Sequence, residues 1–381
     1  MHKRTSSSIP KVVLVLGLVS LLTDVSGEMV ASTLPQFLAV ELAVAAAFIG
    51  VVEGIADLVS NILKAVFGAV SDQLRKRKPI IALGYAISAV TRPCFAAASS
   101  ATDVLLLRSV DRVGKGARTA PRDALIASAA GDALGKSFGI HRALDTAGAL
   151  IGPLIAIPLL SLFGFRTLYL LTLLPGGVAL TLLLAFVHEP PMEVKQRLPP
   201  SALLQRPVLK ILLITIGLSL GHLSALFLIA RAFELGFGVL SPIGFYVLFN
   251  AIYALSSAPA GVLADRIGIN RVLAIGIGWA ALSYITLVFA AANPLVLVPL
   301  AFVLFGLSYG FCEGQLRAFA ASRAPEEAIG TSIGAYYLGA GIASFTANTI
   351  ASTLWIYLSP QIALTYATAA AIFGVLIALT A

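Results

Sequence analysis

Cysteine is scarce in this chain: only Cys94 and Cys312 occur in 381 residues. Both lie inside long apolar segments, so neither a disulfide framework nor a cysteine-ligated metal cluster is expected. The four histidines do not combine with carboxylates at the spacing of a metal site. The sequence also lacks a phosphate-binding loop, a nucleophile elbow and a catalytic metal motif. We therefore predict no metal, no cofactor and no enzymatic activity.

Charge is also scarce. Charged residues make up 12% of the chain and hydrophobic residues 59%, and the mean hydropathy is +0.95. Soluble domains usually contain about 25% charged residues, and one soluble core could not bury this much apolar surface. The composition therefore predicts a protein of the lipid bilayer.

Twelve apolar stretches approach the roughly 20 residues that are needed to cross the hydrocarbon of a membrane. They begin near Lys11, Phe48, Pro79, Asp103, Phe138, Phe165, Leu209, Ser241, Arg271, Pro294, Ile329 and Pro360. Lipid offers the backbone no hydrogen-bond partner, and the stretches are too long and too continuously apolar for barrel strands, so each is predicted to be an α-helix. The predicted fold class is all-α integral membrane, with twelve transmembrane helices.

Basic residues predict the orientation. They cluster in the amino-terminal tail, after the second span, between the sixth and seventh spans, and at Arg266, Arg271 and Arg323. All these sites fall on one side of the membrane, which the positive-inside rule makes cytoplasmic. We expect a multi-pass protein of the bacterial inner (cytoplasmic) membrane with both termini inside. The net charge of +8 then reflects topology, and no nucleic-acid partner is expected.

One loop motif occurs twice in the sequence. GAVSDQLRKRKP runs from Gly68 to Pro79 and GVLADRIGINRV from Gly261 to Val272, half the chain apart. A second repeated pattern follows each copy of the loop: Ser128, Gly135 and Gly139 in the first half correspond to Ser322, Gly330 and Gly334 in the second. Two related apolar halves are a known transporter construction. With the proline-rich linker between them, they predict two pseudo-symmetric six-helix bundles at residues 1–187 and 208–381, joined by a cytoplasmic linker at 188–207.

Together these features resemble the major facilitator superfamily, whose loop between spans two and three reads G-x-L-A-D-R-x-G-R-K. The carboxy-terminal copy matches at Gly261, Leu263, Ala264, Asp265, Arg266 and Gly268. The amino-terminal copy keeps Gly68, Asp72, Lys76 and Arg77, but Gln73 replaces the arginine and Arg75 the second glycine. We therefore expect the turn of the amino-terminal copy to differ in geometry.

The resemblance implies alternating access, with this loop holding the cytoplasmic gate closed. The implied gating residues are Gly68, Asp72, Arg75, Arg77, Gly261, Asp265, Arg266 and Gly268. A carboxylate at a helix end can accept N–H groups at the positive end of a neighbouring helix, which stabilises by about 0.3 to 1 kcal/mol when exposed. The alternative for the cations from Arg75 to Lys78 is that they only anchor topology.

The fifth span contains GALIGP, in which Gly148, Gly152 and Pro153 resemble the G-x-x-x-G-P pattern of the family's proton-coupled exporters. The glycine pair expected after this pattern is replaced by Ala156 and Ile157. The same spacing of small residues also lets ordinary membrane helices pack closely. The motif therefore permits either interpretation.

The fourth span carries a stripe of charge. Arg108, Asp111 and Arg112 lie on one helical face, and Arg118 continues the stripe toward the cytoplasmic gate. Charges inside a membrane cost about 2.5 to 3.5 kcal/mol each on insertion scales, so this face must turn inward. It could attract an anionic substrate, hold nearby carboxylates ionised, or form a structural network with Asp111 between its two arginines.

Two carboxylate pairs lie one helical turn apart, Asp24 with Glu28 and Glu53 with Asp57. Carboxylates this close repel when both are ionised, so one member can carry a proton. Neutralisation by Arg92 would instead make a pair structural. We favour Asp24 and Glu28, because the first helix of each half lines the central cavity in the family that the chain resembles.

The fifth span opens with His141, Arg142 and Asp145, which could relay protons or support the gate. The carboxy-terminal half is poorer in charge and richer in tyrosine. Its main intramembrane carboxylate, Glu313, is followed one turn later by Arg317. We expect the amino-terminal half to couple charge and the carboxy-terminal half to shape the substrate pocket.

The predicted function is secondary active transport of a small organic compound by alternating access, as proton-coupled export (antiport) driven by the proton gradient. Its partners are the substrate, protons and the lipid bilayer, and we expect a monomer. The alternative is uptake or exchange of an organic anion through a cationic cavity. A non-transporting receptor with this fold would need a soluble output domain, which the sequence does not suggest.

Overall fold

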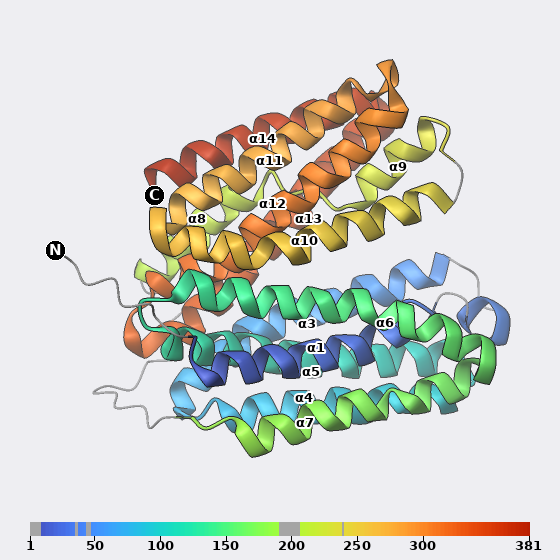
Figure 1. Ribbon diagram of the computed structural model, residues 1–381, viewed down its shortest axis with the longest axis vertical. Helices are drawn as coiled ribbons and strands as arrows, with labels where there is room; N and C mark the ends of the chain where they lie inside the picture. Colours follow the sequence, from blue (N-terminus) through green and yellow to red (C-terminus); the bar gives the residue numbers. More distant parts are fainter. Residues whose placement is uncertain (1–8, 35–36, 43–46, 190–205, 238–239) are drawn as a thin grey trace. The chain divides into compact units, whose positions relative to one another are not determined.

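The computed structural model describes residues 9–34, 37–42, 47–189, 206–237 and 240–381. Throughout this described part the regular structure is helical (Figure 1). The side chains of Glu53 and Asp57 lie outside the described set. Their predicted role therefore stays a prediction.

The described residues of the first half form six α-helices, and a single π-helical turn, Phe37–Glu41, follows the first of them. The helices are α1 (Lys11–Ala31), α3 (Ala47–Leu74), α4 (Lys78–Cys94), α5 (Ala101–Ala130), α6 (Leu134–Leu171) and α7 (Leu173–Phe186). Gly164, at a φ of 75°, interrupts α6, so α6 and α7 together supply the fifth and sixth predicted spans. A left-handed φ of this kind is readily adopted only by glycine.

The second half contributes seven α-helices. These are α8 (Arg206–Ser219), α9 (Leu226–Glu234), α10 (Leu240–Ile267), α11 (Ile269–Val288), α12 (Pro294–Ser322), α13 (Ile329–Tyr357) and α14 (Pro360–Thr380). Together α8 and α9 form the seventh predicted span. Over the described residues the helices therefore account for the twelve spans expected from hydropathy, and the predicted fold class is confirmed.

The break between α8 and α9 was not predicted. Side chains satisfy the backbone groups that the break frees: the Leu223 N–H donates to the Tyr284 hydroxyl at 3.0 Å, and the Ser224 N–H donates to Asn348 Oδ1 at 2.9 Å. The Tyr284 hydroxyl in turn donates to the Gly221 carbonyl at 2.9 Å. A helix can break at membrane depth only where such partners replace the lost intrahelical bonds.

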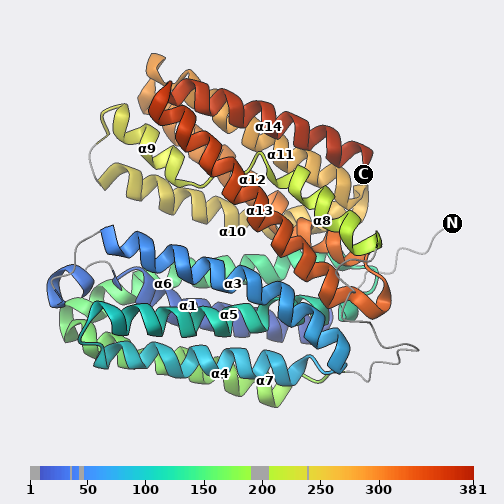
Figure 2. The ribbon, with the colours of Figure 1, turned by 180° about the vertical axis from the view of Figure 1, so that it is seen from behind.

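Helix packing repeats between the two halves. In the first half α5 packs against α3 and α4, and α7 packs against α1 and α4. In the second half α12 packs against α10 and α11, and α14 packs against α8 and α11. Figures 1 and 2 show each set of helices from both sides. Each pair in one half has its counterpart in the other, as the internal repeat requires.

The chain clusters into two compact units. The first contains residues 1–131, 144–205 and 324–334, and the second contains 132–143, 206–323 and 335–381. The first turns of α6 and α13 thus each group with the unit opposite to the rest of their helix. The sequence-based division at 188–207 stays a prediction for the folding domains.

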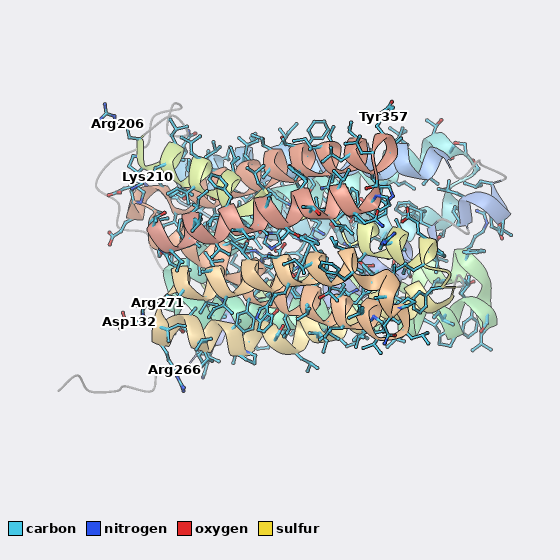
Figure 3. The ribbon with its side chains drawn as sticks, turned by 90° about the horizontal axis from the view of Figure 1, so that it is seen from above. Asp132, Arg206, Lys210, Arg266, Arg271 and Tyr357 are labelled. Atoms are coloured by element: carbon cyan, nitrogen blue, oxygen red, sulfur yellow. The ribbon has the colours of Figure 1, made fainter. Side chains whose placement is uncertain are left out.

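Seven helical segments in the described part of the chain are long and apolar enough to cross a membrane. In the second unit, Arg206, Lys210, Arg266 and Arg271 lie at one end of the helices, and Tyr357 lies at the other end (Figure 3). These four basic residues of the second unit therefore lie at the same end of its helices.

Candidate functional site

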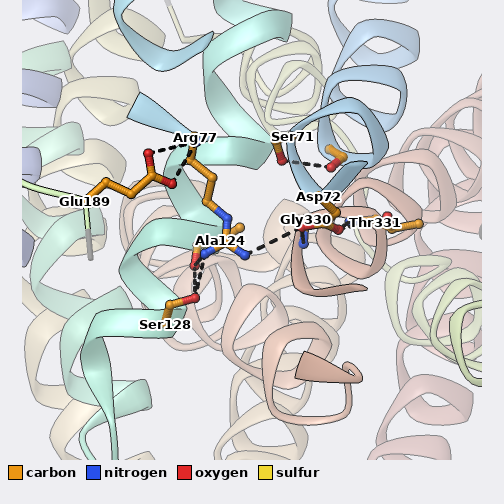
Figure 4. Close-up of polar contacts among 9 residues, drawn as sticks. Ser71, Asp72, Arg77, Ala124, Ser128, Glu189, Gly330 and Thr331 are labelled. Carbon is orange, nitrogen blue, oxygen red and sulfur yellow. Dashed lines mark hydrogen bonds and ion pairs between the residues drawn. The ribbon is translucent and has the colours of Figure 1, made fainter. Parts of the chain in front are cut away.

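Asp72 caps a helix that is distant in the sequence. It lies in the last turn of α3 and is buried, with 5% of its surface exposed. Its carboxylate accepts the N–H groups of Gly330 at 3.1 Å and Thr331 at 2.6 Å, and the Thr331 hydroxyl at 2.9 Å (Figure 4). Gly330 and Thr331 belong to the first turn of α13, where N–H groups have no intrahelical partner. The predicted helix-end contact is therefore present.

Arg77 compensates the charge of Asp72. Its guanidinium is 1% exposed and lies 3.5 Å from the Asp72 carboxylate. It also donates to the Ala124 carbonyl at 3.1 Å and to Ser128 Oγ at 2.6 Å. Arg77 is thus fixed by buried contacts, and surface anchoring does not describe its position.

Glu189 holds the start of the next helix. Its carboxylate accepts the backbone N–H of Arg77 at 2.7 Å and that of Lys78 at 2.8 Å, so it caps α4 (Figure 4). Sequence reasoning missed this residue. It belongs to the expected linker, and no local spacing links a carboxylate to a helix start more than a hundred residues away.

Asp265 makes the corresponding cap in the second unit. It lies in the last turn of α10 and accepts the N–H groups of Gly135 at 2.7 Å and Lys136 at 2.9 Å, both in the first turn of α6. Unlike Asp72, Asp265 is exposed, as is Arg266 beside it. Both aspartates therefore cap the first turn of a helix that is distant in the sequence, Asp72 in buried surroundings and Asp265 at the surface.

Glycines allow both caps to form. A Cβ on Gly330 would lie 2.6 Å from the Gly68 carbonyl oxygen and 2.9 Å from the Asp72 carboxylate. In the other copy, a Cβ on Gly135 would lie 2.9 Å from the Gly261 carbonyl oxygen. A side chain at either contact would force the backbones apart.

Arg75 adopts the conformation expected of the glycine it replaces. Its φ is 54°, and Gly268 at the equivalent position has a φ of 97°. Both copies thus place a residue with a positive φ three positions after the aspartate, but Gly268 has a ψ of 145°, outside the left-handed helical region. The expected difference in turn geometry stays a prediction. For an arginine this conformation costs about 1 to 2 kcal/mol.

The stripe on α5 forms buried ion pairs. Asp111 lies 3.0 Å from Arg92 of α4 and 3.7 Å from Arg108. The predicted clamp on Asp111 therefore has Arg92 where Arg112 was expected, while Arg112 acts on Asp111 only as a nearby charge. Arg92 also donates to the Thr23 carbonyl at 2.5 Å. This geometry matches the structural network that the sequence left open.

Arg118 sits further along α5 and is 2% exposed. It donates to Ser88 Oγ at 2.6 Å and to the Gly84 carbonyl at 3.3 Å, and it lies 4.6 Å from the centre of the Tyr85 ring. All these partners belong to α4. In the described contacts Arg118 therefore joins α5 to α4, and its predicted gating role stays a prediction.

The carboxyl of Asp24 meets a partner from another helix. Asp145 of α6 is close enough to interact with it, and Lys115 of α5 is close enough to interact with both carboxyl groups. Glu28 lies one turn further along α1 and is a weaker influence on Asp24 than Asp145. Asp145 therefore acts on Asp24 more strongly than Glu28 does.

The residues at the start of α6 separate between the two units. Asp145 groups with the first unit, whereas His141 and Arg142 group with the second. Arg142 donates to the Tyr253 hydroxyl, and its guanidinium lies 4.9 Å from the Tyr253 ring centre. Proton relay or gate support by the three residues stays a prediction.

Glycines of the GALIGP segment pack α6 against α1. A Cβ on Gly152 would lie 2.7 Å from the Glu28 Cβ and 2.9 Å from the Val25 carbonyl, and Gly148 meets Leu21 in the same way. Pro153 follows inside the helix. The close-packing interpretation of this motif thus has a structural basis, which does not bear on the direction of transport.

The second unit contains an aromatic and charged cluster. Arg317 lies 3.3 Å from Glu313 and 5.9 Å from the ring centre of Tyr337. Tyr309 packs against the rings of Tyr253 and His222. Tyrosines therefore surround the intramembrane charges of this half.

A groove of about 360 Å³ opens beside α9 and α13 in the second unit. It is lined by Ser224, Phe227, Ala230, Asn348, Ser352, Trp355 and Ile356. At its edge Glu234 accepts the Trp355 indole N–H at 2.8 Å and pairs with Arg231 at 2.9 Å. Sequence reasoning missed this groove, because its polar residues come from the break in the seventh span (Ser224) and from α13 (Asn348 and Ser352).

Long apolar helices in two related halves, with ionisable groups buried among them, define a polytopic membrane protein built to handle charge inside the bilayer. A model of the Major Facilitator Superfamily matches residues 16–348. An uncharacterized MFS-type transporter of Methanocaldococcus jannaschii is 33% identical, with the alignment covering 99% of this chain and 96% of the relative. The chain therefore belongs to the major facilitator superfamily.

Solved structures share the fold. A bacterial homologue of the iron transporter ferroportin, in an outward-facing state with soaked iron, has a TM-score of 0.77 at 17% identity, covering 97% of this chain and 98% of that one. The human organic anion transporter MFSD10 has a TM-score of 0.74 at 17% identity, covering 96% and 98%. As a family member, the protein is a multi-pass secondary transporter of a small molecule and not an enzyme.

Proposed function

We propose that this transporter exports a small organic compound in exchange for protons, with Asp24 as the coupling carboxyl. One observation carries the proposal: Asp24 lies within α1 beside a second carboxyl, while the nearby Arg92 is engaged by Asp111 at 3.0 Å. Because Asp111 engages Arg92, Lys115 is the cation that remains beside Asp24, and a carboxyl next to a second carboxyl can gain and lose a proton. Export, as opposed to import, is supported by the resemblance of GALIGP to the exporter pattern.

The two aspartate caps supply the proposed gate. Asp72 and Asp265 each join the last turn of one helix to the first turn of another, α13 and α6 respectively. Alternating access requires helix ends on one side of the membrane to separate and rejoin. We assign that switching contact to the two caps, with Gly68 and Gly261 permitting the close approach and Arg77 stabilising the amino-terminal copy.

The basic end of the helices is assigned to the cytoplasm. Arg206, Lys210, Arg266 and Arg271 gather at one end of the second unit (Figure 3), and basic residues concentrate on the cytoplasmic side of membrane proteins. Both termini are then cytoplasmic, in the inner membrane of a bacterial cell.

Purified protein in liposomes tests this proposal. A panel of drugs and organic acids, assayed with and without an imposed pH gradient, should contain compounds whose movement the gradient drives. Asp24→Asn should abolish that dependence while the protein still folds, whereas Glu28→Gln serves as the matched change one turn away. Transport that ignores the gradient, or that survives unchanged in Asp24→Asn, would contradict the assignment.

A second candidate function is uptake or exchange of an organic anion. It is supported by the excess of arginine around Asp111, since Arg92, Arg108 and Arg118 are all buried near this single carboxylate. Arg112→Glu should then abolish thermal stabilisation by organic anions while the protein remains folded. A variant that fails to express would instead indicate a purely structural stripe.

A further inference from the structure

The groove in the second unit has the size of a small-molecule site. Its hollow of about 360 Å³ beside α9 and α13 shares Asn348, Ser352 and Ile356 with a second hollow of about 520 Å³, so the two form one groove along α13. Small-molecule sites typically enclose about 300 to 1,000 Å³. Tyr357, which lines the second hollow, lies at the end of the unit opposite the four labelled basic residues (Figure 3). The groove therefore reaches the end of the helices that is away from the basic side chains.

Two aromatic side chains form one wall of this groove. The ring centres of Phe227 in α9 and Trp355 in α13 lie 5.6 Å apart, with the ring planes inclined by 57°. The Trp355 indole N–H donates to Glu234 Oε1 at 2.8 Å, which fixes the orientation of the ring and uses its only donor. Trp355 can therefore offer a ligand stacking and apolar contact but no hydrogen bond. A ligand that carries an aromatic ring gains most from such a wall.

The ion pair at the edge of the groove is internally balanced. Glu234 pairs with Arg231 of the same helix at 2.9 Å, and Arg231 is 5% exposed. Among the described residues that line the two hollows, none is acidic, basic or a histidine. A charged ligand would lose water here without gaining an opposite charge, which is costly. The groove therefore favours an uncharged ligand.

Asn348 and Ser352 supply the polar contacts of the groove. Asn348 Nδ2 donates to the Ser344 carbonyl at 2.7 Å and to the Ser344 hydroxyl at 3.0 Å, whereas Asn348 Oδ1 accepts the Ser224 N–H at 2.9 Å. These bonds fix the amide, so that its donors are engaged while Oδ1 keeps a second lone pair. Ser352 is exposed one turn further along α13, and its hydroxyl can donate or accept. Both side chains can therefore accept a hydrogen bond from a ligand.

We propose that this groove binds the transported compound, and that the compound carries an uncharged aromatic ring with an O–H or N–H group. The ring packs against Phe227 and Trp355, while the donor reaches Asn348 Oδ1 or the Ser352 hydroxyl. As a substrate site the groove depends on the proposed export function, and it specifies the substrate class. In the proposed orientation it lies at the outer end of the helices, where an exporter releases its substrate.

Tryptophan fluorescence measures binding to this groove without any transport, because the chain has only two tryptophans. In full-length Trp279→Phe protein in liposomes, Trp355 is the sole source of tryptophan emission. Benzamide should change that emission saturably. Benzoate adds a negative charge, benzylammonium adds a positive charge, and cyclohexanecarboxamide lacks the aromatic ring. Each of these three compounds should bind about tenfold more weakly than benzamide.

Two further changes in the same background test the contacts. Ser352→Ala should weaken benzamide binding by about 2- to 10-fold, as expected for the loss of one hydrogen bond. Ser161→Ala is the matched control, because it removes an exposed hydroxyl of α6 that does not line the groove, and it should leave binding unchanged. Phe227→Leu should weaken benzamide but not cyclohexanecarboxamide, a selectivity that general distortion of the groove would not produce. Thermal unfolding of each variant confirms that the protein is folded.

The assignment is overturned if benzamide gives no saturable change, or if any of the other three compounds binds as tightly. It is also overturned if Ser352→Ala and Phe227→Leu leave benzamide binding unchanged. Selective binding of benzamide without gradient-driven flux of any compound would refute the proposed function alone. Gradient-driven export of a compound that neither alters Trp355 emission nor competes with benzamide would refute this inference alone.

Discussion

The two copies of the repeated loop reach the same contact by different means. Asp72 is buried, receives three hydrogen bonds and has Arg77 as its cation. Asp265 is exposed and receives two hydrogen bonds from the backbone. A buried carboxylate needs a charge partner that an exposed one does not. The amino-terminal copy is therefore a charge-compensated lock, whereas the carboxy-terminal copy is a solvated cap.

The substitutions in the amino-terminal copy fit that difference. Gln73 replaces the arginine of the family pattern, yet its position is exposed, as is Arg266 in the other copy. Losing a cation there removes no buried contact. The compensating cation comes from Arg77, four residues further along, which the left-handed turn at Arg75 allows to fold back onto the aspartate.

Replacing each aspartate with alanine should reveal the largest difference in stability between the two copies. Asp72→Ala leaves Arg77 as a buried, uncompensated charge, and we expect it to lower the free energy of unfolding by about 3 to 5 kcal/mol. Asp265→Ala removes only a solvated cap and should lower it by about 1 kcal/mol or less. Thermal unfolding of the purified proteins in detergent measures both. Equal losses would show that burial does not distinguish the two caps.

A methyl group at the cap of α13 should have the next largest effect. Gly330→Ala places its Cβ against the Gly68 carbonyl and the Asp72 carboxylate, and overpacking of this kind costs about 1 to 3 kcal/mol. Gly278→Ala is the matched control, since a Cβ at that position in α11 meets nothing within 4 Å. The unfolding midpoint should fall only for Gly330→Ala. A similar fall in both variants would point to a general effect of losing a glycine.

The smallest expected effect lies at the positive-φ position that the copies share. Arg75→Gly should raise the free energy of unfolding by about 0.5 to 1 kcal/mol, because it removes the strain of a positive φ at some entropic cost. Gly268→Ala, the reciprocal change, should lower it by a similar amount. Opposite shifts of the midpoint would confirm that both turns need a residue with a positive φ at this position, whereas shifts in one direction would refute it.

Hydropathy and helix periodicity were enough to predict the fold. The predicted starts at Pro294, Ile329 and Pro360 are the first residues of α12, α13 and α14, since lipid dictates both the length and the helical form of a span. The break in the seventh span was missed because its stability comes from Tyr284 and Asn348, which lie elsewhere in the chain.

The candidate site was predictable in part. The position of Asp24 deep in a predicted span indicated a role in proton coupling. The repeated loop motif indicated that Asp72 and Asp265 cap helix ends. Spacing along one helix suggested Glu28 as the partner of Asp24, but Asp145 of another helix is also close enough to interact with Asp24. Contacts between helices depend on how the bundle packs, and a helical period cannot reveal them.

Glu189 has a practical consequence for dividing the molecule. Transporters of two related halves invite expression as two separate chains that reassemble in the membrane, with the cut placed in the connecting segment. Glu189 closes the start of α4 through Arg77 and Lys78, so the opening residues of that segment belong structurally to the first half. A cut before Glu189 would leave the first half without the residue that caps α4, so the start of that helix would fray next to Asp72 and Arg77. A cut a few residues later would keep Glu189 in the first half and preserve the cap.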